Sequence, residues 1–202
     1  MQSPFAIIGE SGRGKTNILK GILNQLEEKK VYLFDTKSRE LFSYKNQDGI
    51  SYVQSDEQLE EFVREITELG ETREAEFANA LMENEDLTMK EFISSQEPVY
   101  VVVDGTDEFT ERINEDYEDE IAGIIEKASS LGVVFIFSIH AAKFHGYDDL
   151  TSFIKKSNYG LVLSDQGMAD IFPMSYSDKV EFGRGFLFDN GNKMEIMLPE
   201  CS

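Results

Sequence analysis

A glycine-rich segment near the start of the chain contains residue types that bind phosphate. Glycines let the backbone curl so that successive N–H groups point inward at phosphate oxygens. Lys15 would reach the β- and γ-phosphates of a nucleotide, and the hydroxyl of Thr16 would hold Mg²⁺. The segment satisfies the pattern GxxxxGK[ST] in full with Gly9, Glu10, Ser11, Gly12, Arg13, Gly14, Lys15 and Thr16.

An acidic residue elsewhere in the chain also points to nucleotide binding with Mg²⁺. Asp104 follows Val99–Val103, the most apolar run of the chain, and a nucleoside triphosphatase needs a carboxylate at such a strand end for its magnesium shell. Efficient ATPases place a glutamate next, but this chain has Gly105 there. Asp107 and Glu108 could replace that glutamate only if the loop folds back; the alternative is that both are surface acids. The sequence therefore predicts intact binding and weakened hydrolysis.

His140 follows another apolar run, Val133–Ile139. At the end of a parallel strand it would face the γ-phosphate, where a polar sensor residue is expected. The alternative is a strand-end residue that bonds only to the backbone. Two histidines and the distant Cys201 do not make a metal site.

The elements that must position these residues alternate between strand and helix. Pairs with the capping-box pattern, Ser55 with Gln58 and Thr88 with Glu91, mark two helix starts. Because the expected strands are apolar on both faces, we predict an α/β domain over residues 1–202, with a mainly parallel sheet, helices on both faces and a C-terminal hairpin. Strands are expected at 5–8, 31–34, 99–103, 133–139 and 159–163, with the hairpin at 186–198, and helices at 18–26, 59–69 and 121–131.

The amino-acid composition of the chain argues against some classes of function. The 202 residues are 41% hydrophobic, which favours an ordered core, and carry a net charge of −20, which argues against nucleic acid or an anionic membrane surface as a partner. Residues 51–130 hold 24 acidic and 5 basic side chains. This acidic region is either a solvated face or a docking face for a basic neighbour. The single cysteine excludes an internal disulfide.

The ordered set of motifs resembles the FtsK/SpoIIIE-type ATPases, and most closely the last ATPase module of the type VII secretion coupling proteins (EssC/EccC/YukB-like). The resemblance covers essentially the whole chain. It rests on PFAIIGESGRGKTNILK, VYLFDTKSREL with Asp35 and Lys37, VYVVVDG, ASSLGVVFIFSIH with His140 where glutamine is common, and EFGRGFLF.

The resemblance implies a RecA-like P-loop NTPase fold with ATP and Mg²⁺ as ligands. It also implies one domain cut from a longer, membrane-anchored protein of several modules, on the cytoplasmic side of the membrane, with no direct membrane contact by this domain. The partners implied are small helical secreted proteins with an export signal and neighbouring ATPase modules of the same chain, assembled as a hexamer.

Two departures from the family pattern bear on whether this chain hydrolyses ATP. Gly105 replaces the catalytic glutamate, and Asn158 stands where translocases carry an arginine. We expect a degenerate ATP-binding module that recognises exported substrate with weak or no hydrolysis; the alternative is an active ATPase motor module within a hexamer. For the partner groove we predict Met168, Ile171 and Phe172, with ordinary core packing as the alternative.

Overall fold

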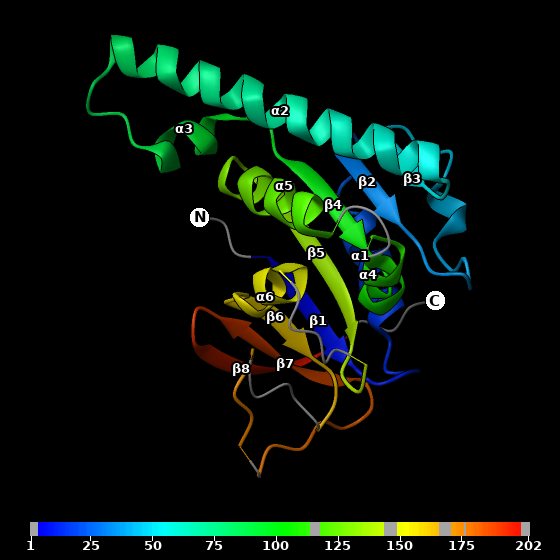
Figure 1. Ribbon diagram of the computed structural model, residues 1–202. Helices are drawn as coiled ribbons and strands as arrows, with labels where there is room; N and C mark the ends of the chain where they lie inside the picture. Colours follow the sequence, from blue (N-terminus) through cyan, green and yellow to red (C-terminus); the bar gives the residue numbers. More distant parts are fainter. Residues whose placement is uncertain (1–3, 114–117, 144–148, 166–170, 176, 199–202) are drawn as a thin grey trace.

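The computed structural model describes residues 4–113, 118–143, 149–165, 171–175 and 177–198, which form one eight-stranded sheet with helices on its faces (Figure 1). The strands are β1 (Phe5–Gly9), β2 (Lys30–Phe34), β3 (Ile50–Val53), β4 (Val99–Val103), β5 (Val133–His140), β6 (Tyr159–Val162), β7 (Arg184–Asp189) and β8 (Asn192–Met197). The helices are α1 (Lys15–Leu23), α2 (Asp56–Glu83), α3 (Met89–Ser95), α4 (Thr106–Ile113), α5 (Glu118–Ser130) and α6 (Asp149–Lys155), with a 3₁₀ turn, η1 (Phe42–Tyr44).

The strand order is β3-β2-β4-β5-β1-β6-β7-β8, and the first six strands run parallel. Strands β7 and β8 are antiparallel to their neighbours and form the expected terminal hairpin. Its turn places Asn190 and Gly191 at positive φ, which suits the two-residue turns of hairpins. The mainly parallel sheet predicted from the sequence is therefore confirmed.

The apolar composition of β1 suits its central position in the sheet. Ile7 and Ile8 are completely buried, since β1 lies between β5 and β6 with helices on both sides. Because parallel strands end at the same edge, the segments after β1, β4 and β5 meet there. In the register of β1 and β5, Gly9 lies opposite His140. This edge gathers the residues that the sequence singles out for chemistry.

The two faces of the sheet are covered unequally. Helices α2, α4, α5 and α6 pack on one face, with Phe62, Phe135 and Phe137 among the buried side chains. The other face is covered by α1 and by the segment around η1, through Leu19, Leu23 and other buried side chains. Helices on both faces were expected, and their residue periodicity explains which side of each helix is buried.

Helix α2 extends beyond the sheet, and α3 returns alongside it (Figure 1). Both predicted capping boxes are present, at Ser55 and at Thr88. The ring centroids of Phe77 and Phe92 are 5.3 Å apart, so an aromatic contact joins the two helices. Although α2 has 28 residues, no helix in the described ranges is both long and apolar enough to cross a membrane.

Candidate functional site

The segment between β1 and α1 has the backbone of a phosphate-binding loop. Gly12 and Gly14 adopt φ values of 76° and 89°, which glycine tolerates without strain. A Cβ atom on either residue would meet nothing within 4 Å, so the space beside both glycines is open. Helix α1 begins directly after Gly14, so its N-terminus lies at this loop, which favours an anion there.

The ammonium of Lys15 lies inside this loop. Its Nζ donates hydrogen bonds of 2.9 Å to the carbonyl oxygens of Gly9 and Glu10. Burial lowers the pKa of Lys15, while the nearby carboxylate of Asp104 opposes the shift. The side chain is therefore held at the loop by neutral acceptors that a phosphate could replace.

Asp104 connects the phosphate loop to the middle of the sheet. It follows β4 and is buried, with 6% of its surface exposed. The hydroxyl of Thr16 donates to Oδ2 of Asp104 at 2.9 Å, and the hydroxyl of Ser138 donates to Oδ1 at 2.5 Å. The predicted juxtaposition of Thr16 and Asp104 is thus present, across 88 residues of sequence.

This arrangement fits a nucleotide with Mg²⁺. The hydroxyl of Thr16 and the carboxylate of Asp104 are hard oxygen donors of the kind that Mg²⁺ prefers, and the rest of its shell would come from water and phosphate oxygens. The open loop and the helix N-terminus fit the phosphates. Among the described residues no cluster of three or more His, Cys, Asp or Glu side chains forms a metal site by itself.

The structure gives a physical reason for the glycine at position 105. Gly105 has a φ of 69°, a conformation that residues with a side chain rarely adopt. Its N–H donates to the hydroxyl of Ser138 at 3.1 Å. A Cβ atom there would lie 2.4 Å from Cγ2 of Thr36, closer than such atoms can approach. A glutamate cannot occupy this position without rearrangement.

Asp107 and Glu108 do not lie in a loop, so that part of the sequence interpretation is wrong. Both belong to the first turn of α4, where negative charge is favourable. Oε2 of Glu108 accepts a hydrogen bond of 2.9 Å from the backbone N–H of Lys37. Oδ2 of Asp107 pairs with Nζ of Lys143 at 2.7 Å. The two carboxylates therefore have different partners, and a catalytic role for Glu108 stays a prediction.

His140 ends β5 beside the phosphate loop, as its register with Gly9 shows. Its Nδ1 is buried and has no hydrogen-bond partner among the described residues. The backbone N–H of Lys143 donates to the carbonyl of His140 at 2.9 Å. The location suits a sensor of the γ-phosphate, and that role stays a prediction.

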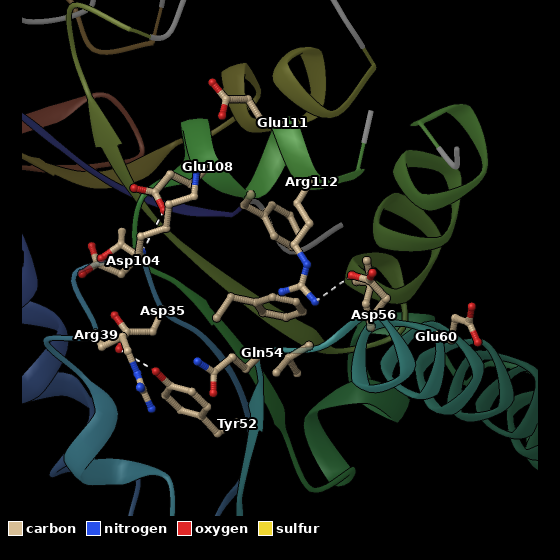
Figure 2. Close-up of a pocket in the computed structure, with 16 residues that line it drawn as sticks. Asp35, Arg39, Tyr52, Gln54, Asp56, Glu60, Asp104, Glu108, Glu111 and Arg112 are labelled. Carbon is tan, nitrogen blue, oxygen red and sulfur yellow. Dashed lines mark hydrogen bonds and ion pairs between the residues drawn. The ribbon is translucent and has the colours of Figure 1, made fainter. Parts of the chain in front are cut away.

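A pocket of about 860 Å³ lies at the carboxyl ends of β2, β3 and β4, next to the phosphate site (Figure 2). Asp35 lines it. Oδ2 of Asp35 accepts from the hydroxyl of Tyr52 at 2.8 Å, while Oδ1 is buried with no hydrogen-bond partner among the described residues. Burial raises the pKa of Asp35 and raises the pKa of Tyr52 to about 12.

The segment predicted to bind a partner takes part in core packing. Phe172 is 2% exposed, and its ring stacks on Phe188 with centroids 4.7 Å apart. Ile171 is also buried, and Met168 lies outside the described residues. The observed contacts agree with the alternative stated for these residues, while a partner groove here stays a prediction.

Three further residues belong to the site, and sequence reasoning did not find them. Ser138 bonds Asp104, Thr36 lies against Gly105, and Lys143 pairs with Asp107. Ser138 sits inside an apolar strand and is 1% exposed, and a buried hydroxyl among Val, Ile and Phe is the one signal that could have revealed it.

The fold and the site define a P-loop nucleoside triphosphatase domain of the FtsK/SpoIIIE, RecA-like type. The chain is homologous to the ATPase modules of the YukB, EssC and EccC proteins of type VII secretion. No protein-family model matches the chain.

The relatives are much longer than this chain. The ESX secretion system protein YukB of Bacillus subtilis (strain 168) is 28% identical over an alignment of 203 residues that covers 97% of this chain and 13% of YukB. The solved cytoplasmic domain of EssC superimposes with a TM-score of 0.82 at 27% identity, over 96% of this chain and 39% of that one. A Thermomonospora curvata EccC structure (ATPases 2 and 3), in complex with a signal sequence peptide, shares the fold at 20% identity, with a TM-score of 0.70 over 100% of this chain and 37% of that one.

Proposed function

We propose that this chain is the ATP-binding module of a type VII secretion coupling protein that recognises exported substrate and hydrolyses nucleotide weakly or not at all. The observation that carries the proposal is the contact of Thr16 with Asp104 beside an open phosphate loop. In such a module Lys15 binds the β- and γ-phosphates, while Thr16 and Asp104 hold Mg²⁺.

Weak hydrolysis is proposed because of the residue after Asp104. A water molecule that attacks the γ-phosphate needs a group to orient it, and Gly105 has no side chain to do so. The positive φ of Gly105 and its closeness to Thr36 show that the surrounding structure is adapted to glycine. Loss of a water-orienting group lowers the rate by orders of magnitude and changes nucleotide affinity much less.

Substrate recognition and assembly are proposed from the relatives. The EccC structure with a signal sequence peptide supports a small helical secreted protein as the partner. The chain spans about 13% of the length of its curated relatives, so neighbouring ATPase modules of the same protein are further partners. The proposed location is the cytoplasmic side of the membrane, where a full-length hexamer would hold this module.

Calorimetric titration with Mg-ATP tests the nucleotide-binding part. The unchanged chain should bind saturably, and Lys15→Ala should abolish binding because the phosphates lose their cation. Lys20→Ala is the matched control, since Lys20 lies one turn further along the same helix, away from the loop. A correctly folded chain that does not bind Mg-ATP would overturn the nucleotide part of the proposal.

One observation favours a second candidate function, an active motor module. The carboxylate of Asp107 lies near Gly105, at 4.0 Å from the position of a Cβ atom on that glycine. A carboxylate so placed could substitute for the missing glutamate. ATP turnover at rates typical of motors, measured with purified chain or an assembled hexamer, would favour this candidate over the first.

A further inference from the structure

The first turn of α4 is fixed to the strand beside the phosphate loop. The hydroxyl of Thr106 donates to the carbonyl of Ser138 at 2.8 Å, and the N–H of Gly105 donates to the Ser138 hydroxyl. Thr106 is completely buried. Since β5 pairs with β1, these bonds set the distance between the α4 turn and the loop that follows β1. The next residue, Asp107, is therefore positioned by packed structure.

The side chain of Asp107 is directed from this turn toward the segment after β5, where its Oδ2 is 2.7 Å from Nζ of Lys143. Its Oδ1 would be 4.0 Å from a Cβ atom at position 105. Burial lowers the pKa of Lys15, while the negative charges of Asp104, Asp107 and Glu10 each raise it. Asp107 is 21% exposed and thus partly screened from solvent by the site.

Glu108 lies on the other side of the turn. It lines the pocket at the ends of β2 and β4, as Figure 2 shows, and accepts the backbone N–H of Lys37. Consecutive residues of a helix project about 100° apart, so the two carboxylates point in different directions. Of the two acids, Asp107 is the one paired with Lys143 in the segment after β5.

Lys143 supplies a positive charge at the same place. Its Nζ is 2.7 Å from Oδ2 of Asp107, and its backbone N–H is bonded to the carbonyl of His140. Its positive charge also lowers the pKa of Lys15. Asp107 and Lys143 thus form an ion pair at the edge of the phosphate site, contributed by the same chain.

We propose that Asp107 is the water-orienting catalytic carboxylate of this module and that Lys143 is its counter-ion, an inference that rests on the proposed nucleotide binding. In the step itself, the water oxygen forms a bond to the γ-phosphorus as the bond from that phosphorus to the β–γ bridging oxygen breaks. Asp107 accepts the proton of the water, ADP leaves with the electron pair of the broken bond, and the proton passes to the phosphate product. Because an aspartate is shorter than a glutamate and this one is held in an ion pair, we expect slow turnover, in keeping with the weak hydrolysis proposed above.

The test compares Asp107→Asn with the matched control Glu111→Gln, which removes an exposed carboxylate from the same helix, in the full 202-residue chain. Single-turnover hydrolysis of Mg-ATP should fall by about 100-fold or more in Asp107→Asn and by less than about 2-fold in Glu111→Gln. The Kd for Mg-ATP should stay within about 3-fold of the unchanged chain in both variants, because neither acid holds the phosphates. Asp107→Glu keeps the carboxylate and should keep measurable turnover.

A readout other than turnover uses Mg-ADP with aluminium fluoride, which mimics the γ-phosphoryl group under attack. The unchanged chain and Glu111→Gln should form a stable complex, seen as a rise in melting temperature, and Asp107→Asn should not. Melting curves without ligand verify that each variant is folded.

Each contrary outcome has a defined meaning. Mg-ATP binding without hydrolysis by the unchanged chain would overturn the inference, because the proposed groups all belong to this chain. Equal rates for Asp107→Asn and the unchanged chain, or an equal loss in Glu111→Gln, would also overturn it and leave the proposed binding function intact. Absence of Mg-ATP binding in the folded, unchanged chain would overturn both.

Discussion

Gly105 and Thr36 are packed so closely that no side chain fits between them. A Cβ atom on Gly105 would lie 2.4 Å from Cγ2 of Thr36, and the φ of Gly105 is 69°. Thr36 follows β2 and Gly105 follows β4, which are paired neighbours in the sheet. The missing catalytic glutamate is therefore accompanied by a backbone and a neighbour that have adapted to glycine.

We predict that Gly105→Glu does not restore fast hydrolysis. The substitution combines an unfavourable φ with a collision, so it should reduce the free energy of unfolding by about 1–3 kcal/mol. Urea unfolding measures the loss, and a single-turnover assay measures the rate. Gly105→Ala is the control that introduces the strain without a carboxylate, and it should be destabilised similarly. A stable Gly105→Glu chain with rapid turnover would contradict the prediction.

Ser138 should be important for both stability and the magnesium site. Its hydroxyl donates to Asp104 and accepts the N–H of Gly105, and it is 1% exposed. Ser138→Ala leaves that N–H and a carboxylate oxygen without this partner, which typically costs about 1–3 kcal/mol. We expect reduced stability in urea and weaker Mg²⁺-dependent ATP binding by calorimetry. An unchanged free energy of unfolding would show that water replaces the hydroxyl.

The sequence predicts the elements whose signals are local. Strands β1, β4 and β5 are rich in apolar residues, and the caps of α2 and α3 have both members of a capping box. Strand β3 was missed because it is four residues long and includes an exposed serine, Ser51. Helix α4 was missed because Gly105, and not a typical capping side chain, precedes it.

The site was predictable where one contiguous motif defines it. The phosphate loop and Asp104 can be recognised in the sequence, because each directly follows an apolar run that predicts a buried strand. The contacts of Ser138 with Asp104 and of Lys143 with Asp107 join residues more than 30 positions apart, and no local pattern indicates such pairs. The different directions of Asp107 and Glu108 appear only once both are on a helix.

Asp35 should make stability depend on pH. Burial raises its pKa, so the folded chain binds this proton more tightly than the unfolded chain. This group therefore lowers the free energy of unfolding as the pH rises above the usual aspartate pKa of about 3.9. Well below that pH the carboxyl is protonated in both the folded and the unfolded chain, so the effect disappears. Asp35→Asn keeps an oxygen acceptor for Leu41 and Tyr52 and removes the charge.

We accordingly expect Asp35→Asn to be more stable than the unchanged chain at pH 7, by up to about 1 kcal/mol because solvent screens the site. The difference should shrink toward pH 4. Melting temperatures from pH 4 to 8 measure it, and Glu71→Gln, which removes an exposed carboxylate from α2, should show no such trend. A difference that is independent of pH would contradict the assignment.

Arg73 should anchor α2 to the rest of the domain. It is 4% exposed and donates 2.6 Å hydrogen bonds to the carbonyls of Leu131 and Glu97, so one side chain connects α2 to the segments before β5 and β4. Burial lowers its pKa. The planar guanidinium reaches two acceptors at once, which a lysine ammonium on a flexible stem does less well.

Arg73→Ala should therefore reduce the free energy of unfolding by about 2–4 kcal/mol, because two buried carbonyls lose their donor and a cavity forms. Arg64→Ala is the matched control on the same helix. Arg64 forms exposed pairs with Glu61 and Glu68, so its loss should cost less than about 1 kcal/mol. Urea unfolding distinguishes the two, and equal losses would show that the Arg73 bonds contribute no more than a surface pair.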